Sequence, residues 1–248
     1  MKTKGIFPRI WRKLKIVLLV LFVAHLVYIV ILKWINPPTT LTMIGSRISL
    51  IGSGKSFKRD WVDFDEISAN AKLAVISSED QLFPDHEGFD YKSIEKAMEQ
   101  NKKGKRRRGA STISQQVAKN VFLWQGGGWF RKGLEVYFTF MIEKIWGKKR
   151  ILEVYLNVAE MGEGIFGIEA AAQTYYNKQA LMLNREEAAM IAACLPNPIT
   201  HTVVPPARIT VWRQKRILQQ MRNLAPDPDI KEMLKVEKTT KPDKKPGA

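Results

Sequence analysis

The sequence contains a single cysteine, Cys194, among its 248 residues. One cysteine allows no internal disulfide, and it excludes a metal site built from several thiolates. Because Cys194 lies in the apolar run Ala-Ala-Met-Ile-Ala-Ala-Cys-Leu, we expect it to be a small buried core residue.

Acidic residues are also few, 24 against 40 lysines and arginines, which gives a formal net charge of +16. This excess indicates an anionic partner, which could be nucleic acid, an anionic membrane surface or a phosphorylated substrate. Strong β-strand patterns are missing as well, while apolar residues recur at helical spacing. We therefore expect one sizeable, mainly α domain with appendages.

Long apolar runs occur only once, near the amino terminus. Residues 16–32 carry no formal charge, and with Lys33 and residues 34–35 the run reaches the roughly 20 residues that span a bilayer. Asn36-Pro37-Pro38 follows in place of a small-residue cleavage site, so we expect an uncleaved transmembrane anchor at residues 16–35.

The distribution of charge around this run predicts its orientation. Six basic residues precede it, whereas only Lys33 and Arg47 follow it closely. By the positive-inside rule, residues 1–15 form a cytoplasmic basic tail and the rest of the chain lies outside the cytoplasm. This placement argues against a nucleic-acid partner.

Residues 36–60 are expected to be a linker that passes into irregular or short extended structure. Within it, Gly52-Ser53-Gly54-Lys55-Ser56 resembles the end of a phosphate-binding loop, but Ser49 stands where that pattern needs glycine. We therefore reject a nucleotide site.

An acidic segment, residues 78–90, stands out in this basic chain as Ser-Glu-Asp-Gln-Leu-Phe-Pro-Asp-His-Glu-Gly-Phe-Asp. Proline, glycine and aromatic residues predict a shaped loop after a helix over residues 66–77, with Asp65 as its cap. A helix end followed by a rigid loop can hold a carboxylate, so Glu79 is the candidate.

A further helix is predicted to start at Ser111 or the preceding glycine turn, and two features in this region bear on function. Before it, residues 101–108 form a basic run that could be a solvated loop, a site of attraction to anionic lipid headgroups, or both. On the helix, Thr112, Gln116, Lys119 and Asn120 fall on one polar stripe. The stripe could be plain surface, or it could bind an oligoanion or a sugar diphosphate.

The segment at residues 122–130 combines three glycines with tryptophans and phenylalanines, and we expect it to enter the membrane interface. A helix over residues 131–146 follows. On it, Arg131 and Lys132 lie four and three residues before Glu135, so they can hold this carboxylate among cations. A surface ion-pair ladder is the alternative interpretation.

Further helices are predicted at residues 151–157, 168–176, 186–195 and 206–224, with a glycine-rich loop at residues 162–167. From residue 225 to residue 248, proline and lysine with few apolar residues indicate a disordered tail.

Five motifs in this order resemble those of the peptidoglycan glycosyltransferases, glycosyltransferase family 51. The resemblance covers residues 61 to 222 approximately, and it defines residues 61–224 as the glycosyltransferase domain. Too little chain follows Pro198 for the transpeptidase domain of bifunctional members, so we expect a monofunctional one. The motifs are Glu79-Asp80 with Phe83, His86 and Gly88; residues 109–120; Arg131-Lys132 with Glu135; residues 151–157; and residues 171–178 with 187–198.

The resemblance implies a lysozyme-like α fold that follows one transmembrane helix. It also implies an enzyme that polymerises lipid II, a disaccharide-pentapeptide on undecaprenyl diphosphate, into β-1,4 glycan strands. It implies that Glu79 is the catalytic base and Glu135 the second carboxylate. Lys119, Arg131 and Lys132 would neutralise the leaving diphosphate. Thr112, Gln116 and Asn120 would orient phosphate or sugar, and Asp80, Phe83 and His86 would shape the loop.

The same resemblance implies further partners: the growing glycan strand, bacterial membrane lipids, and cell-wall synthesis or division proteins. It makes no cofactor certain, and it is compatible with a divalent cation, Mg²⁺ or Mn²⁺, at the diphosphate. The expected location is the bacterial inner membrane, with the catalytic domain periplasmic or otherwise extracytoplasmic.

Two other functions fit parts of the pattern. A lysozyme-like hydrolase would need a protonated carboxylic acid in an apolar pocket, whereas cations around Glu135 favour its ionised form. A non-catalytic, membrane-anchored binder of wall polymer would need no pair of carboxylates.

Overall fold

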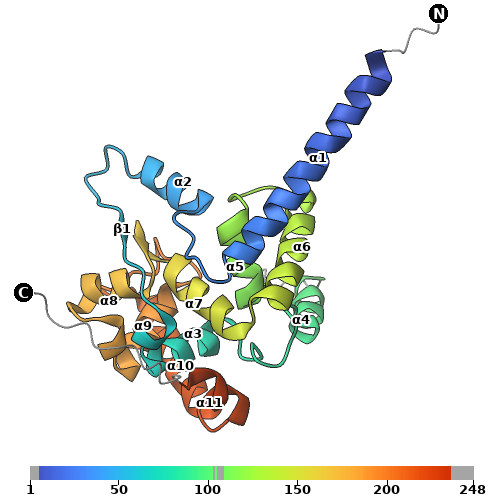
Figure 1. Cartoon of the computed structure of the whole chain (residues 1–248). Coiled ribbons are helices and arrows are strands. Elements are labelled where there is room, and N and C mark those ends of the chain that lie inside the picture. The colour runs from blue at the N-terminus through green and yellow to red at the C-terminus, as the bar shows by residue number, and fades with distance from the viewer. Residues whose placement is uncertain (1–5, 103, 105–108, 236–248) are drawn as a thin grey trace, which may run out of the picture.

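The computed structural model describes residues 6–102, 104 and 109–235 and confirms a mainly helical chain. In Figure 1, a long helix, α1 (Ile6–Ile31), rises from a body of shorter helices. A small sheet accompanies them. Its central strand, β3 (Ile165–Phe166), pairs parallel with β1 (Lys58–Arg59) and antiparallel with β2 (Glu160–Gly162). Where a glycine-rich loop was predicted, the chain therefore forms a short hairpin.

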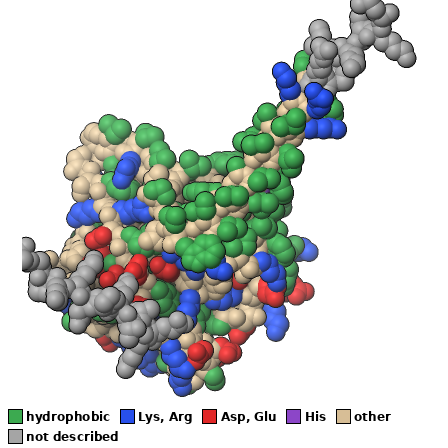
Figure 2. All heavy atoms as spheres, in the orientation of Figure 1, with side chains coloured by type: hydrophobic (Ala, Val, Ile, Leu, Met, Phe, Trp, Pro, Cys, Tyr) green, Lys and Arg blue, Asp and Glu red, His purple; other side chains and the backbone are tan. Residues whose placement is uncertain are grey.

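Helix α1 contains residues 16–31 of the predicted membrane span. Within the described residues, Ile10–Ile31 is the stretch long and apolar enough to cross a membrane, with a mean hydropathy of 2.8. Figure 2 shows hydrophobic side chains along the part of α1 that leaves the body, with basic side chains near its outer end. The helix begins earlier and ends earlier than the predicted span of 16–35. Residues 1–5 of the predicted tail lie outside the described residues.

The inner end of α1 is packed into the body. Ile29 and Leu32 are 0% and 1% exposed. The carbonyl oxygen of Ile29 accepts a hydrogen bond from Trp146 Nε1 at 2.8 Å, and Arg150 donates to the carbonyl oxygens of Leu32 and Ile35. Carbonyls near a helix carboxyl end lack partners within the helix, and here Trp146 and Arg150 serve the carbonyl of Ile29 and two carbonyls just beyond the helix. The anchor is therefore part of the domain's packing.

The predicted linker, residues 36–60, is not irregular throughout, because α2 (Leu41–Ser49) forms within it. Thr40 caps this helix by accepting a hydrogen bond from the Met43 backbone N–H. Glycine, serine and threonine lower helix propensity here, which hid the helix from sequence reasoning. Helix α2 stands on the same side of the body as α1 (Figure 1).

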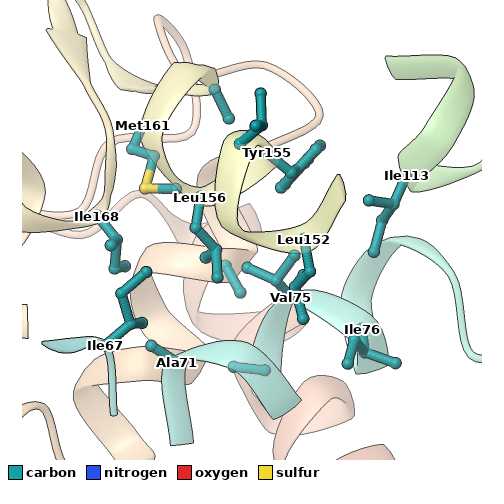
Figure 3. Packing of buried hydrophobic residues seen from close by; sticks show 14 of the residues in the cluster. Ile67, Ala71, Val75, Ile76, Ile113, Leu152, Tyr155, Leu156, Met161 and Ile168 are labelled. Carbon is teal, nitrogen blue, oxygen red and sulfur yellow. The ribbon is translucent and has the colours of Figure 1, made fainter. Parts of the chain in front are cut away.

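The core of the body lies between α3 (Ala69–Glu79), α7 (Lys148–Val158), α9 (Arg185–Cys194) and α10 (Arg208–Leu224). Figure 3 shows Val75 and Ile76 of α3 close to Leu152 and Leu156 of α7. All four are at most 1% exposed. Cys194 is buried, as predicted.

Helix α3 both starts and ends later than predicted, and the later end changes the position of Glu79. Ser68, not Asp65, is its cap, with its hydroxyl accepting from the Ala71 backbone N–H. The preceding acidic residues instead form a short 3-10 turn, Phe64–Glu66. Because the helix extends two residues beyond its predicted end at residue 77, Glu79 is its last residue. The prediction had placed Glu79 in the loop that follows.

The remaining helices are α4 (Tyr91–Lys102), α5 (Ile113–Phe122), α6 (Trp129–Ile145), α8 (Ile168–Tyr176) and α11 (Pro228–Leu234). The last contradicts a disordered tail from residue 225 onward, because Ile230 and Met233 of α11 are buried. Two apolar residues at helical spacing suffice to dock this short helix. The part of the tail at residues 236–248 lies outside the described residues, as do residues 103 and 105–108 of the basic run.

Candidate active site

Glu79 sits at the carboxyl end of α3 with 12% of its side chain exposed. Its Oε1 accepts a hydrogen bond from Ser78 Oγ at 2.9 Å, and its Oε2 accepts one from Gln116 Nε2 at 3.0 Å. The guanidinium of Arg213, on α10, lies 3.8 Å from Oε1. The carboxylate is thus held by two neutral donors, with one cation at longer range.

The loop after Glu79 is fixed by Asp80. This buried carboxylate accepts hydrogen bonds from His86 Nε2 at 3.0 Å and from the Ile113 backbone N–H at 2.9 Å. The other imidazole nitrogen, Nδ1, accepts from the Gly88 backbone N–H, so Nε2 carries the hydrogen that reaches Asp80. Phe83 is fully buried beneath the loop. These contacts place the three predicted loop residues in shaping positions.

Thr112, not Ser111, caps α5. Its hydroxyl oxygen accepts from the Gln115 backbone N–H at 3.2 Å and donates to the Gly88 carbonyl oxygen at 2.7 Å. The side chain is 2% exposed. Its hydroxyl hydrogen is therefore already used within the protein, and the ligand contact expected of Thr112 stays a prediction.

Glu79 lines a cleft of about 900 Å³. Residues of α4, residues 109–112, Pro196 and Arg213 also line it. This space can receive a polar ligand of several rings beside the carboxylate.

A second cleft, of about 630 Å³, lies on the other side of Gln116. Lys119 and Asn120 of α5 line it together with α2 and Glu160. Gln116 borders both clefts, and its Oε1 accepts a hydrogen bond from Tyr155 Oη at 3.2 Å. The structure therefore brings three of the predicted stripe residues, Gln116, Lys119 and Asn120, to one cavity wall.

Lys119 connects the surroundings of the two carboxylates electrostatically. Burial lowers the pKa of Lys119, and the charges of Arg131 and Lys132 lower it further. The carboxylates of Glu135 and Glu79 both act in the opposite direction. An anion bound at Lys119 would accordingly feel the field of all four charged groups.

Glu135, on α6, is 3% exposed and lies between two cations, as predicted. Arg131 Nη1 approaches its Oε2 at 2.8 Å, and Lys132 Nζ bonds to Oε1. The described residues that line the two clefts do not include Arg131, Lys132 or Glu135. Across the described ranges, no group of three or more His, Cys, Asp or Glu side chains is placed to hold a metal ion.

Sequence reasoning missed two residues of the site. Arg213 lies within the helix predicted over residues 206–224, and nothing local connects it with Glu79. Tyr155 lies within the helix predicted over residues 151–157 and is 1% exposed, yet its hydroxyl reaches Gln116. A phenol within an otherwise aliphatic helix face was the one available signal, because a buried hydroxyl needs a partner.

Comparison with known proteins gives consistent matches. A family model described as Transglycosylase matches residues 45–222. A biosynthetic peptidoglycan transglycosylase of Bacteroides thetaiotaomicron is 44% identical over 239 residues, 96% of each chain. Proteins of the same name from Haemophilus influenzae and Shigella boydii are 45% and 56% identical, covering 90% and 68% of this chain and 96% and 70% of their own.

Proposed function

The chain belongs to the transglycosylase family, and from this premise we propose that it polymerises lipid II into β-1,4-linked glycan strands and releases undecaprenyl diphosphate. Family membership makes it a peptidoglycan glycosyltransferase of cell-wall biosynthesis. The lipid substrate, the leaving group and the residue roles are the proposed part. The observation that carries them is the position of Glu79 beside Gln116, where the two clefts meet.

Glu79 is the proposed catalytic base. To join two sugars, a base must take the proton of the acceptor hydroxyl as its oxygen attacks the anomeric carbon of the donor. Ser78 and Gln116 orient the carboxylate through neutral hydrogen bonds and leave part of it open to the 900 Å³ cleft. The acceptor sugar would therefore lie in this cleft.

The donor would lie on the other side of Gln116, with its diphosphate near Lys119. A diphosphate leaves as a stable anion, so it needs neutralisation of charge more than a proton. Lys119 supplies the nearest charge, and Arg131 and Lys132 add to its field. Glu135 would order these two cations, and Asn120 would orient phosphate or sugar. Attack opposite an α-linked diphosphate inverts the anomeric centre and gives a β bond.

The surroundings of Glu135 argue against a hydrolase. A glycan hydrolase must protonate a poor sugar leaving group with a carboxylic acid held in an apolar pocket. Both oxygens of Glu135 are instead engaged by Arg131 and Lys132. A non-catalytic wall binder is disfavoured by the polar arrangement around Glu79, which binding alone does not need.

Exposed apolar side chains support contact between the domain and the membrane interface. Trp129 and Phe130, at the start of α6, are 92% and 76% exposed, and α2 exposes Leu41 and Ile48. Such residues are stable at a lipid interface. We propose a single-pass protein of the bacterial inner membrane with a cytoplasmic amino terminus and an extracytoplasmic catalytic domain.

Purified full-length protein supplied with labelled lipid II tests the proposed function, with products separated by size. The wild type should make long strands and Glu79→Gln almost none. Glu87→Gln is the matched control, because Glu87 lies in the same loop with an exposed side chain. Shortening of preformed glycan would instead support the hydrolase, and binding without product would support the wall binder.

A further inference from the structure

The Glu79 cleft continues along a helix to which the proposed chemistry assigns no part. Helix α4 lines it with Ser93, Lys96, Ala97 and Gln100, which recur at the three- and four-residue spacing of one helix face. Within the described part of α4, Ala97 is the buried residue. Ser93 and Lys96 on the same face are exposed, so this part of α4 borders the open cleft.

Two cations line this cleft, and they differ in their commitments. Arg213 donates to the Ala193 carbonyl oxygen at 3.1 Å and to Ser78 Oγ at 3.2 Å, and it lies close to Glu79. Lys96 has no hydrogen bond or ion pair among the described residues. Its ammonium group is free to meet a ligand.

The acidic side chains of the cleft other than Glu79 do not compete for this ammonium. Asp80 accepts from His86 and from a backbone N–H of α5. Asp90 accepts from the Ser93 backbone N–H at 2.9 Å at the start of α4. Both carboxylates are engaged in fixing their own segments, so Lys96 is the unengaged charge of this wall.

We propose that Lys96 pairs with an anionic group of the acceptor, located one sugar beyond the hydroxyl that Glu79 deprotonates. This inference rests on the proposed function, since it takes the acceptor to be lipid II. The second sugar of that acceptor carries two kinds of anion, the carboxylates of its peptide and the diphosphate. An ammonium group on a flexible stem can pair with either.

The pairing selects and positions the acceptor without taking part in bond formation. Because Lys96 is solvent-accessible, the ion pair is screened and its contribution is modest. Its loss should raise the KM for lipid II about two- to fivefold and leave kcat within about twofold.

The matched variants are Lys96→Ala and Lys92→Ala. Lys92 is exposed on the same helix and does not belong to the described lining of the cleft. Steady-state polymerisation is measured for both variants with lipid II, and again with lipid II whose peptide carboxylates are amidated. Binding of both lipids is also measured in the Glu79→Gln background, where turnover does not interfere.

A Lys96-specific rise in KM that disappears with the amidated lipid identifies the peptide carboxylates as the partner. A rise that persists with the amidated lipid identifies the diphosphate. Equal behaviour of Lys96→Ala and Lys92→Ala in kinetics and in binding overturns the inference, even when the wild type polymerises normally. A wild type that makes no polymer overturns the proposed function instead, and the binding measurements still decide the role of Lys96.

Discussion

The two carboxylates of the site lie in opposite surroundings. Glu79 ends a helix, is bonded by the neutral side chains of Ser78 and Gln116, and borders a large cleft. Glu135 lies within a helix, nearly inaccessible, with each oxygen engaged by a cation.

This difference fits the two proposed roles, a reactive base for Glu79 and an ordering carboxylate for Glu135. A base must present an oxygen to the substrate hydroxyl, which neutral donors and an open cleft permit. A carboxylate bonded on both oxygens by cations has no such oxygen to present, but it fixes the direction of those cations. Under the proposed function, the same side chain type would therefore serve two purposes, set by what surrounds it.

The largest test of this contrast is Glu79→Gln. The amide keeps the shape and cannot take up the acceptor proton, so polymerisation should fall about a thousandfold or more. The melting temperature should stay close to that of the wild type, since no close ion pair is lost. Polymer yield and thermal unfolding in the same detergent are the measurements. Activity above a tenth of the wild type would remove Glu79 from the chemistry.

Glu135→Gln should behave differently, because it damages both structure and activity. It leaves Arg131 and Lys132 close together without their counter-charge, and loss of one partner of a buried ion pair costs up to about 3–5 kcal/mol. Both cations keep some solvent contact, so we expect about 1–3 kcal/mol here. Polymerisation should fall about a hundredfold.

Thermal unfolding and donor-analogue binding check this second prediction. For a chain of this size, 1 kcal/mol corresponds to a shift in melting temperature of about 2–4 °C. Glu143→Gln offers a comparison, since it also removes a partly buried carboxylate of α6 that pairs with a lysine, Lys148. A Glu135→Gln protein as stable as the wild type would mean that the ion-pair cluster does not order this region.

The sequence predicted the parts of the site that depend on local spacing. Arg131 and Lys132 had to fall near Glu135 once the segment was helical, because residues three and four apart share a face. Gln116 and Lys119 were on one stripe for the same reason. Helix geometry alone was enough to predict the relative positions of these side chains.

The contacts made between distant segments could not be predicted in this way. Arg213 reaches Glu79 from another helix, and Arg150 binds carbonyls at the end of the anchor. Such contacts depend on how helices pack, which periodicity within one helix does not determine. The missed helices α2 and α11 are short, with weak propensity, and tertiary contacts complete them.

A smaller effect is expected at Gln116, which supports Glu79 without reacting. Gln116→Ala removes the hydrogen bond to Glu79 and leaves the buried Tyr155 hydroxyl without its partner. We expect kcat to fall about tenfold, the scale of one well-placed hydrogen bond. Tyr155→Phe is the control, because it removes only the outer contact and should cost less. An equal loss in both variants would place the effect in packing around Tyr155.

The smallest effect concerns Lys119, whose charge belongs to the cationic side of the comparison. Burial lowers the pKa of Lys119, so it loses its proton at a lower pH than an exposed lysine does. The affinity for a diphosphate-bearing donor analogue should therefore decline as the pH rises through this lowered pKa. Lys119→Arg keeps its charge throughout that range and should hold its affinity to higher pH.

Donor-analogue binding measured from about pH 7 to pH 10 distinguishes these curves, with the loss of one cation worth up to about tenfold in Kd. Lys144→Arg is the control, because Lys144 is an exposed lysine of α6 and its replacement should leave the curve unchanged. If Lys119→Arg and the wild type lose affinity in parallel, the titrating group is another one, and Lys119 does not meet the diphosphate. If only the wild type loses affinity, Lys119 is the cation that receives the leaving diphosphate. Because burial lowers its pKa, Lys119 loses its charge within this range of pH, whereas Arg131 beside Glu135 stays charged.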